Sequence, residues 1–562
     1  MVAALRSKEN DCRSCYKCIR NCPTKAISFS AGQARIDGGA CIYCGRCYEV
    51  CPQSCKIIRD ETEAVKRLLE SEEVYASLAP SFLAAYPGSS FARMRKALQR
   101  LGFADAEETA IGATIVKKEY DRLVNEQKED VIISTCCHSI NLLVEKYYPE
   151  LVPCLAPVLS PMQAHAQDLK RRHPGAKVVF IGPCISKKDE IDAFPGYDDN
   201  VLTFLELNAL FLEAGIAVEK DPEPKRVEAS LTRLFPTQGG ILASMEKSNG
   251  GYAYLSFSGE DEVFPALENI RRGGVHRAFI ELSACPGSCI NGPAMPNGNK
   301  EFVSALLAIR HSAGSKDFAV ESYERKLIGK RFRSEAFCFA EPSDEQIRAV
   351  LRQIGKERKE DELNCSCCGY RTCREKAIAV LRGKASLEMC LPYLSKKASN
   401  FASYVIDNSP NGILVVKDDL TISEANAAFC HFAKRPAAEL LGHGLEEFMD
   451  PTLFALALAG EPTRGKHIEL PQYGLFVEAT VTYDPRYKII IGIFRDRTAQ
   501  HKEHEQYVNN ARKTAEITSD VIEKNMRAVQ EIAQLLGEST ANTKIALTNL
   551  AKTIAPEDED GK

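Results

Sequence analysis

Short apolar runs alternate with helical patterns between residues 74 and 282 of the chain. The apolar runs predict four buried strands, at Val74–Pro80, Val131–Ser134, Val178–Gly182 and Ala278–Leu282. The segments between them predict helices at Phe91–Leu101, Ile115–Asn125 and Glu206–Ala214. Strands that are separated by helices favour a parallel α/β region, whose chemistry is expected in the loops after the strands.

The pattern differs in the rest of the chain. Charged helical segments at Asp60–Glu73 and Pro342–Asp361 read as linkers, and the tail PEDEDGK reads as disordered. A mixed domain is predicted from strands at Gly412–Lys417, Phe476–Thr482 and Tyr487–Arg495. From Arg497 to Lys552 a single long helix is predicted, with an apolar association face at Val521, Ile522, Val529, Ile532, Leu535 and Leu536.

Composition narrows the class of protein. The chain has 562 residues, 44% of them hydrophobic, and a net charge of −4, which gives no electrostatic case for a nucleic acid or an anionic membrane. No stretch approaches the roughly 18 apolar residues of a membrane span, and the first residues show no signal-peptide core. We therefore expect a cytoplasmic protein, without a membrane or nucleic acid as partner.

Cysteine carries the strongest chemical pattern. Of 22 cysteines, the first eight form two copies of C-x2-C-x2-C-x3-C-P, the run of two-cluster ferredoxins. In that run the fourth cysteine of each copy ligates the other [4Fe-4S] cluster. The expected sets are Cys12, Cys15, Cys18 and Cys51 for one cluster, and Cys41, Cys44, Cys47 and Cys22 for the other. Zinc is the alternative for a single C-x2-C pair, but it explains a duplicated run poorly.

Three further cysteine loops directly follow three of the predicted strands. They are Ser134–Cys137, Gly182–Lys188 and Glu281–Gly292. Together they supply four thiols, a spare cysteine beside one of them, and a lysine three residues past another. That inventory fits a four-iron cluster in a crevice, with additional chemistry beside it.

These loops resemble the TSCCP, PCxxKK and ExMACPGGCxxGGG motifs of the [FeFe]-hydrogenase large-subunit domain, over about residues 74–340. The resemblance implies that Cys137, Cys184, Cys285 and Cys289 hold the [4Fe-4S] part of an H-cluster. It implies that Cys289 bridges to a diiron subcluster with CO, CN⁻ and dithiolate ligands. It also implies two catalytic side chains, Lys187 on a cyanide and Cys136 in proton transfer. The alternatives are a structural buried cysteine and a solvated lysine.

The chain departs from these motifs at several positions. His138 replaces a proline, while Gly182 and Ser283 stand where the family has methionine. Lys117 and Lys118 stand where at least one glutamate of the outer proton path is expected. Altered packing and an altered proton route predict a slow hydrogenase.

A fourth cysteine set follows the second linker. Cys365, Cys368, Cys373 and Cys390 resemble the small 4Fe-4S domain of carbon-monoxide and corrinoid iron–sulfur proteins, with a helical span predicted from Arg374 to Met389. Zinc is again the alternative. The segments NGILVVKDD, ISEANAAFCHFAKR, LLGHGLEEF and IIIGIFRDRT, in this order between residues 411 and 498, resemble a PAS domain.

The predicted fold is multidomain, α/β and α+β. Its parts are a two-cluster ferredoxin domain (1–60), an α/β H-cluster domain (70–341), a small 4Fe-4S domain (342–397), a PAS domain (400–498) and a C-terminal helix with an acidic tail (499–562). This order resembles the sensory [FeFe]-hydrogenases. The resemblance implies slow interconversion of H2 with protons and electrons, and signalling of H2 or redox state through the PAS domain.

The partners implied are H2, protons, a ferredoxin or other redox protein, a downstream kinase or phosphatase, and a second copy bound through the helix. Two alternatives stay open at this point. One is a metabolic, ferredoxin-linked [FeFe]-hydrogenase. The other is a non-catalytic 4Fe-4S electron-transfer or regulatory protein that lacks the diiron subcluster.

Overall fold

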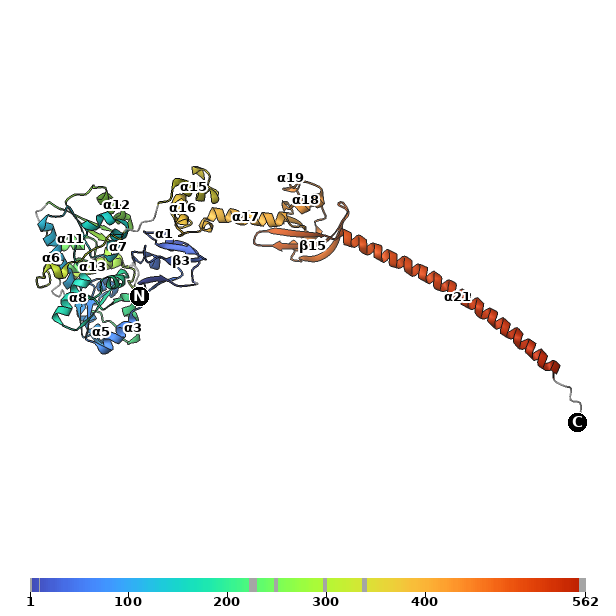
Figure 1. The fold of residues 1–562 in the computed structure, drawn as a ribbon, viewed down its shortest axis with the longest axis horizontal. Coiled ribbons are helices and arrows are strands. Elements are labelled where there is room, and N and C mark those ends of the chain that lie inside the picture. Colours follow the sequence, from blue (N-terminus) through green and yellow to red (C-terminus); the bar gives the residue numbers. More distant parts are fainter. Residues whose placement is uncertain are drawn as a thin grey trace, which may run out of the picture. The chain divides into compact units, whose positions relative to one another are not determined.

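The computed structural model describes residues 3–9, 11–221, 230–246, 251–296, 301–335 and 341–554. The chain divides into two compact units, Met1–Leu394 and Ser395–Lys562, which are treated separately below (Figure 1). Among the described residues, no helix combines the length and the apolar character needed to cross a membrane. The multidomain α/β and α+β architecture predicted above is confirmed, whereas the five domain boundaries stay predictions.

The N-terminal cysteine repeats fold as two similar halves. Two antiparallel pairs form, β1 (Leu5–Ser7) with β4 (Lys56–Ile58) and β2 (Ile27–Ser30) with β3 (Gln33–Ile36). Each half has one short helix, α1 (Lys17–Arg20) or α2 (Arg46–Glu49), which contains the third cysteine of its repeat. The duplicated spacing therefore produces a duplicated fold.

The predicted strands of the central region form, but they belong to two separate parallel sheets. The first sheet has the order β6 (Asp105–Glu108), β5 (Val74–Leu78), β8 (Lys177–Gly182), β9 (Asn200–Thr203). The second has the order β10 (Ala253–Ser258), β11 (Ala278–Ser283), β7 (Val131–Ile133). The loops after β7 and β11 therefore come from one sheet, and the loop after β8 comes from the other.

Helices surround both sheets. The helices that precede β11 in the chain are α3 (Thr62–Ser71), α4 (Phe82–Ala85), α5 (Phe91–Leu101), α6 (Ala110–Glu126), α7 (His138–Tyr147), α8 (Pro161–Arg172), α9 (Ser186–Ala193), α10 (Phe204–Glu213), α11 (Gly240–Ser244) and α12 (Glu260–Arg271). Those after it are α13 (Phe302–Ser312) and α14 (Arg325–Ile328). Capping boxes begin α8 at Ser160 and α10 at Thr203, because each hydroxyl accepts from the backbone N–H three residues later.

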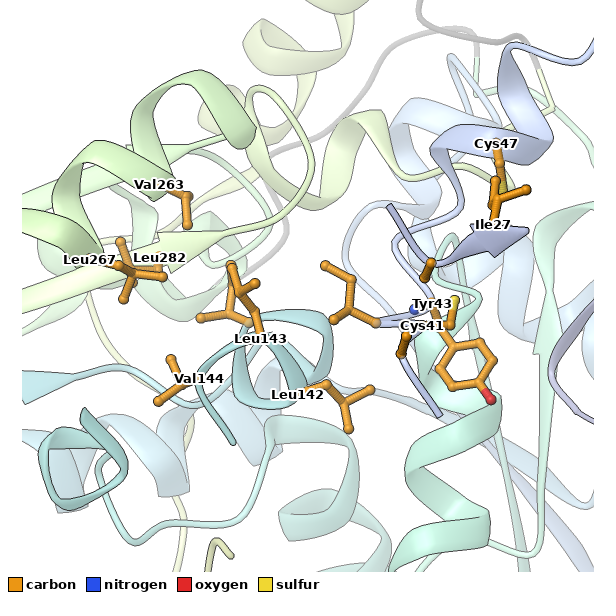
Figure 2. Packing of buried hydrophobic residues seen from close by; sticks show 14 of the residues in the cluster. Ile27, Cys41, Tyr43, Cys47, Leu142, Leu143, Val144, Val263, Leu267 and Leu282 are labelled. Carbon is orange, nitrogen blue, oxygen red and sulfur yellow. Dashed lines mark hydrogen bonds between the residues drawn. The ribbon is translucent and has the colours of Figure 1, made fainter. Parts of the chain in front are cut away.

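One hydrophobic core joins the ferredoxin halves to the second sheet. Figure 2 shows Leu142, Leu143 and Val144 of α7 at its centre. On one side of them lie Val263, Leu267 and Leu282, and on the other lie Ile27, Cys41, Tyr43 and Cys47. The ferredoxin halves are thus packed against the site-bearing sheet through buried apolar side chains.

The small cysteine unit is built on two helices. Helix α15 (Asp344–Gln353) packs Ile347, Val350 and Leu351 against α16 (Cys373–Leu381). Helix α16 is shorter than the predicted span to Met389, because Gly383 adopts a left-handed φ of 68° and the Lys384 N–H bonds the Ala379 carbonyl, which ends the helix. A new helix, α17 (Leu391–Asp407), begins directly after Cys390.

The second unit contains one five-stranded antiparallel sheet. Its order is β13 (Ile422–Ala425), β12 (Gly412–Lys417), β16 (Ile489–Asp496), β15 (Leu475–Asp484), β14 (Thr463–Leu470). The sequence missed β13 and β14, and β14 is an edge strand with mostly exposed side chains and so lacks an apolar alternation. The helices are α18 (Ala427–Ala433), α19 (Ala437–Leu440), α20 (Thr452–Leu458) and the 57-residue α21 (Thr498–Ile554).

Candidate functional site

The three cysteine loops meet between the two parallel sheets. Cys137 precedes α7, Cys184 precedes α9, and Cys285 and Cys289 follow β11. Burial raises the pKa of Cys285, and the nearby thiols of Cys184, Cys137 and Cys289 raise it further. Four thiols gathered in one place, with the charge of three of them disfavouring ionisation of Cys285, are stabilised by a positive group among them, so this donor set fits an iron–sulfur cluster.

The loops approach one another closely enough to require glycine. A Cβ at Gly292 would lie 2.7 Å from the Cβ of Pro183, on the loop after β8. The Ala294 N–H also donates to the Pro183 carbonyl oxygen, at 3.0 Å. The third cysteine loop is thereby held against the second loop.

Cys136 lies beside the four thiols with a tyrosine as its side-chain partner. Its Sγ is 3.3 Å from the Oη of Tyr120, a fully buried residue of α6, and the Thr135 N–H donates to the same Oη at 2.9 Å. Burial raises the pKa of Cys136 to about 12, so the thiol carries its proton. Tyr120 was not predicted from the sequence, although a tyrosine two residues beyond Lys118 of the expected proton path was a usable signal.

Lys187 is buried, so the alternative that it is a solvated lysine does not hold. Its Nζ donates to the Cys136 carbonyl oxygen at 3.2 Å and pairs with Glu190, which also accepts from Lys330 at 2.6 Å. Burial alone would raise the pKa of Glu190, but Lys187 and Lys330 lower it well below its ordinary value. The lysine is therefore fixed beside Cys136 by a buried carboxylate.

Two further buried carboxyl groups lie near this network. Asp198 has no hydrogen-bond partner for either side-chain oxygen in the described part of the chain, and burial raises its pKa well above the ordinary value. Glu281, on β11, accepts from the backbone N–H groups of Gly239, Ile241 and Leu242, at 2.8, 3.0 and 3.2 Å. Burial raises the pKa of Glu281 to about 7, and its charge raises the pKa of Cys136. The sequence did contain a signal for Glu281, because a glutamate within an otherwise apolar strand is unusual.

The departures from the family motifs have local explanations. A side chain at Gly182 would collide with the ring of Phe180, whose atoms lie 2.7 Å from the position of its Cβ. The Ser283 Oγ lies 3.0 Å from the Oγ of Ser288, so this position is polar where the family has methionine. The Nε2 of His138 lies 2.9 Å from Asp189, in agreement with a structural role.

The two lysines in the expected proton path face different partners. Lys117 is buried and pairs with Asp317 at 2.6 Å and with Asp121 at 3.7 Å. Lys118 is exposed and donates to the Val320 carbonyl oxygen. A buried ion pair therefore occupies the place where a titrating glutamate was expected.

Each ferredoxin half lies near the fourth cysteine of the other half. Burial raises the pKa of Cys18 to about 11, and the nearby thiols of Cys12 and Cys51 raise it further. In the second half, burial raises the pKa values of Cys41, Cys44 and Cys47, and Cys22 from the first half raises them further. A Cβ at Gly45, the residue after Cys44, would lie 2.5 Å from Pro293 and 3.0 Å from Ile185, so the Cys22 set is next to the loops of the central site.

The cysteines of the small unit line one cavity. Its walls include Cys365, Cys368, Cys373 and Cys390, together with Tyr370. In the chain as described, no three His, Cys, Asp or Glu side chains are arranged as the ligand shell of a single metal ion. A cluster of several irons is wider than one ion, so the two observations are compatible.

Family comparisons agree with this arrangement. Residues 72–293 match the model of the iron only hydrogenase large subunit, C-terminal domain, and residues 4–52 match a 4Fe-4S dicluster domain. Residues 361–392 match a model of an Fe-S cluster segment, and residues 406–464 match the PAS fold.

Curated relatives are distant. The chain is 24% identical to the NADP-reducing hydrogenase subunit HndD of Solidesulfovibrio fructosivorans, over 57% of this chain and 71% of that protein. It is 27% identical to the periplasmic [Fe] hydrogenase large subunit of Nitratidesulfovibrio vulgaris, over 36% of this chain and 62% of that protein. A solved [FeFe]-hydrogenase HydA1 from Chlamydomonas reinhardtii is 17% identical with a TM-score of 0.40, over 50% of this chain and 100% of that one.

The matches cover the three cysteine-rich parts and the first two strands of the second unit, β12 and β13. Their order along the chain is dicluster domain, hydrogenase domain, Fe-S segment and PAS fold. The protein is a hydrogenase-like iron–sulfur protein with a PAS domain, and its residues 72–293 match the C-terminal domain of the iron-only hydrogenase large subunit.

Proposed function

We propose that this protein holds an H-cluster on Cys137, Cys184, Cys285 and Cys289 and interconverts H2 slowly, as a sensor of H2 or redox state. The observation that carries the proposal is the meeting of these four thiols with Cys136 and Lys187 between the two sheets. The same chain has a PAS domain, a kind of module that suits signalling more than metabolism.

The chain's own residues supply binding, orientation and a proton site. When bound, the diiron group supplies the chemistry that separates H2 into two protons and two electrons. Cys136 holds a proton on Sγ beside Tyr120, and so offers a partly buried group that can give and accept protons. Lys187, fixed by Glu190, presents a positive charge to anionic ligands of the group.

Electrons would leave through the ferredoxin halves. The Cys22 set is next to the loops of the central site, so the cluster that it is proposed to hold would be the first acceptor of an electron from that site. The remaining cysteine sets and an external ferredoxin or other redox protein complete the proposed route. The protein is proposed to act in the cytoplasm and to report to a kinase or phosphatase.

A second copy of the chain is the proposed partner of α21. From Lys502 to Thr553 every described residue of this helix is exposed, which is unfavourable for an isolated helix with large apolar side chains. Its small and apolar residues repeat every 3.5 positions, the period of a coiled coil. The seam is Val508, Ala511, Ala515, Thr518, Ile522, Asn525, Val529, Ile532, Leu536, Ser539, Thr543, Ala546 and Leu550.

A metabolic, ferredoxin-linked hydrogenase is the second candidate. It is favoured by Cys136 and Lys187, since both side chains lie at the central site with supporting partners. The buried Lys117 in the outer proton path and the PAS domain favour the sensor. H2 turnover at a metabolic rate would favour the metabolic hydrogenase over the sensor.

Infrared spectroscopy of anaerobically matured protein tests the proposal. Bands of iron-bound CO and CN⁻ that shift when H2 is added and removed are expected. The Cys289→Ala protein should lack these bands, whereas Cys154→Ala, which alters a cysteine outside the four sets, should keep them. Protein with full four-iron clusters but without such bands would instead indicate a non-catalytic 4Fe-4S protein.

A further inference from the structure

The cavity of the small unit contains a buried lysine. Lys376 is 1% exposed and lines the cavity together with Cys365, Cys368, Cys373 and Cys390. Its Nζ donates to the Leu387 carbonyl oxygen at 3.2 Å. Burying a lysine without an opposite charge is costly, so the lysine requires negative charge in this cavity.

The cysteines supply most of that negative charge, and Glu388 adds to it. Burial lowers the pKa of Lys376, while the thiols of Cys390, Cys368 and Cys373 and the carboxylate of Glu388 raise it. The lysine is therefore close enough to feel charge on the cysteines, and on anything that they hold.

Tyr370 provides a second polar group on the same wall. Its side chain is 3% exposed, and its Oη has no hydrogen-bond partner among the described residues. The tyrosine also lines a larger cavity of about 790 Å³, which Cys22 of the ferredoxin halves borders as well. A buried hydroxyl without a partner is unfavourable, and an acceptor in either cysteine set would relieve it.

The small unit is fastened to the ferredoxin halves at this place. The Nζ of Lys25, three residues past Cys22, donates to the Gly369 carbonyl oxygen at 3.3 Å. The Phe29 N–H donates to the Lys384 carbonyl oxygen at 2.9 Å. The thiols of Cys368 and Cys22 both raise the pKa of Tyr370, which places the ring near both cysteine sets.

We infer that Lys376 and Tyr370 make the small unit an electron-storing site, by stabilising the reduced form of the four-iron cluster held by Cys365, Cys368, Cys373 and Cys390. Adding one electron to a cluster bound by four thiolates increases its negative charge by one. The lysine charge and the tyrosine O–H both favour the more negative state, and such groups set the reduction potentials of iron–sulfur clusters.

The inference rests on the proposed function only for the natural source of the electron. One H2 yields two protons and two electrons, and each cluster takes one electron. One electron would be stored in the small unit, and the other would reside in a ferredoxin cluster. The test supplies dithionite as the reductant and therefore needs no H2.

The experiment is a mediated redox titration of the full-length protein, followed by electron paramagnetic resonance. The Cys390→Ala protein identifies the signal of the small unit by its loss. In Lys376→Met the midpoint potential of that signal should fall by about 59 mV or more, a tenfold change in the ratio of reduced to oxidised cluster. Lys376→Arg should restore it, and Tyr370→Phe should lower it by less.

Arg374→Met is the matched control. Arg374 lies on the same helix α16, but its side chain is exposed and pairs with Asp344, so removing its charge should leave the potential unchanged. An unchanged potential in Lys376→Met, or an equal shift in Arg374→Met, would overturn the inference. If iron analysis shows that the Lys376→Met protein has lost one cluster, the Tyr370→Phe protein provides the test instead. An unchanged midpoint potential in Tyr370→Phe would then overturn the inference. The midpoint potentials could shift as expected while H2 fails to reduce the protein. That result would refute the proposed function and leave this inference standing.

Discussion

Cys136 is a partly buried cysteine whose thiol keeps its proton and has Tyr120 beside it, with Sγ and Oη 3.3 Å apart. We expect Cys136→Ala to lose at least about a hundredfold in H2 turnover, because a positioned proton-transfer group contributes about that much. The CO and CN⁻ bands should persist, since Cys136 is not one of the four proposed ligands. The check is hydrogen–deuterium exchange activity beside infrared spectra, with Cys154→Ala as the control. Normal turnover in Cys136→Ala would remove Cys136 from the proton path.

Glu281 should make stability depend on pH. Burial raises its pKa from the ordinary 4.5 to about 7, so ionisation is more costly in the folded protein than in the unfolded chain. Its contribution is full below pH 4.5 and is lost as the pH rises to about 7, to a limit of about 3 kcal/mol. Calorimetry across this window should show the unfolding midpoint of the hydrogenase domain falling for the wild type and falling less for Glu281→Gln. Parallel curves for the two proteins would show that Glu281 does not titrate in this range.

Residue types and spacing were enough to find the thiols but not their neighbours. Cys137, Cys184, Cys285 and Cys289 could be listed because each belongs to a short motif. Tyr120 belongs to no such motif, and although its place after the expected proton path was a usable signal, its contact with Cys136 depends on the packing of α6 against the loop after β7. The same holds for residues whose partners lie far away in the chain, such as Glu190 with Lys330 and the unpartnered Asp198.

At the scale of elements, strands were predicted well where both faces are buried. All five side chains of β5 and all six of β11 are buried, and such strands appear in the sequence as continuous apolar runs. The sequence could not assign these strands to two sheets, because a buried parallel strand has the same pattern whichever neighbours it pairs with. Helix α16 was predicted too long because the left-handed conformation of Gly383 was not anticipated.

Helix α21 allows a direct test of the proposed seam. We expect Ile532→Lys to weaken or abolish self-association, because a charge at a seam position must be buried in the coiled coil. The Gln534→Lys protein adds the same charge two residues away, outside the seam, and should associate as the wild type does. Light scattering coupled to gel filtration measures the mass of each. Equal masses for all three proteins would show that α21 does not bind a second copy through this seam.

At the scale of the whole chain, H2 chemistry and signalling should be separable. Truncation after Asp407 keeps every proposed cysteine ligand and the whole of α17. We expect this shorter protein to keep its clusters and its H2-dependent infrared bands while losing the response of any signalling partner. Iron analysis and infrared spectra provide the measurement, and a protein ending at Met389, which lacks Cys390, should have one cluster fewer. Loss of all clusters in the longer truncation would contradict a modular chain.

The position of α17 has a consequence for how such chains can vary in length. Cys390 is followed at once by a continuous helix that ends at Asp407, and the Ile406 carbonyl oxygen accepts from the Asn426 side chain of the second unit. Each inserted residue in a helix turns everything beyond it by about 100° and advances it by about 1.5 Å. Insertions of seven residues nearly restore the rotational phase between Cys390 and Ile406, whereas insertions of two reverse it. Changes of length within α17 that preserve this phase should therefore come in multiples of seven residues.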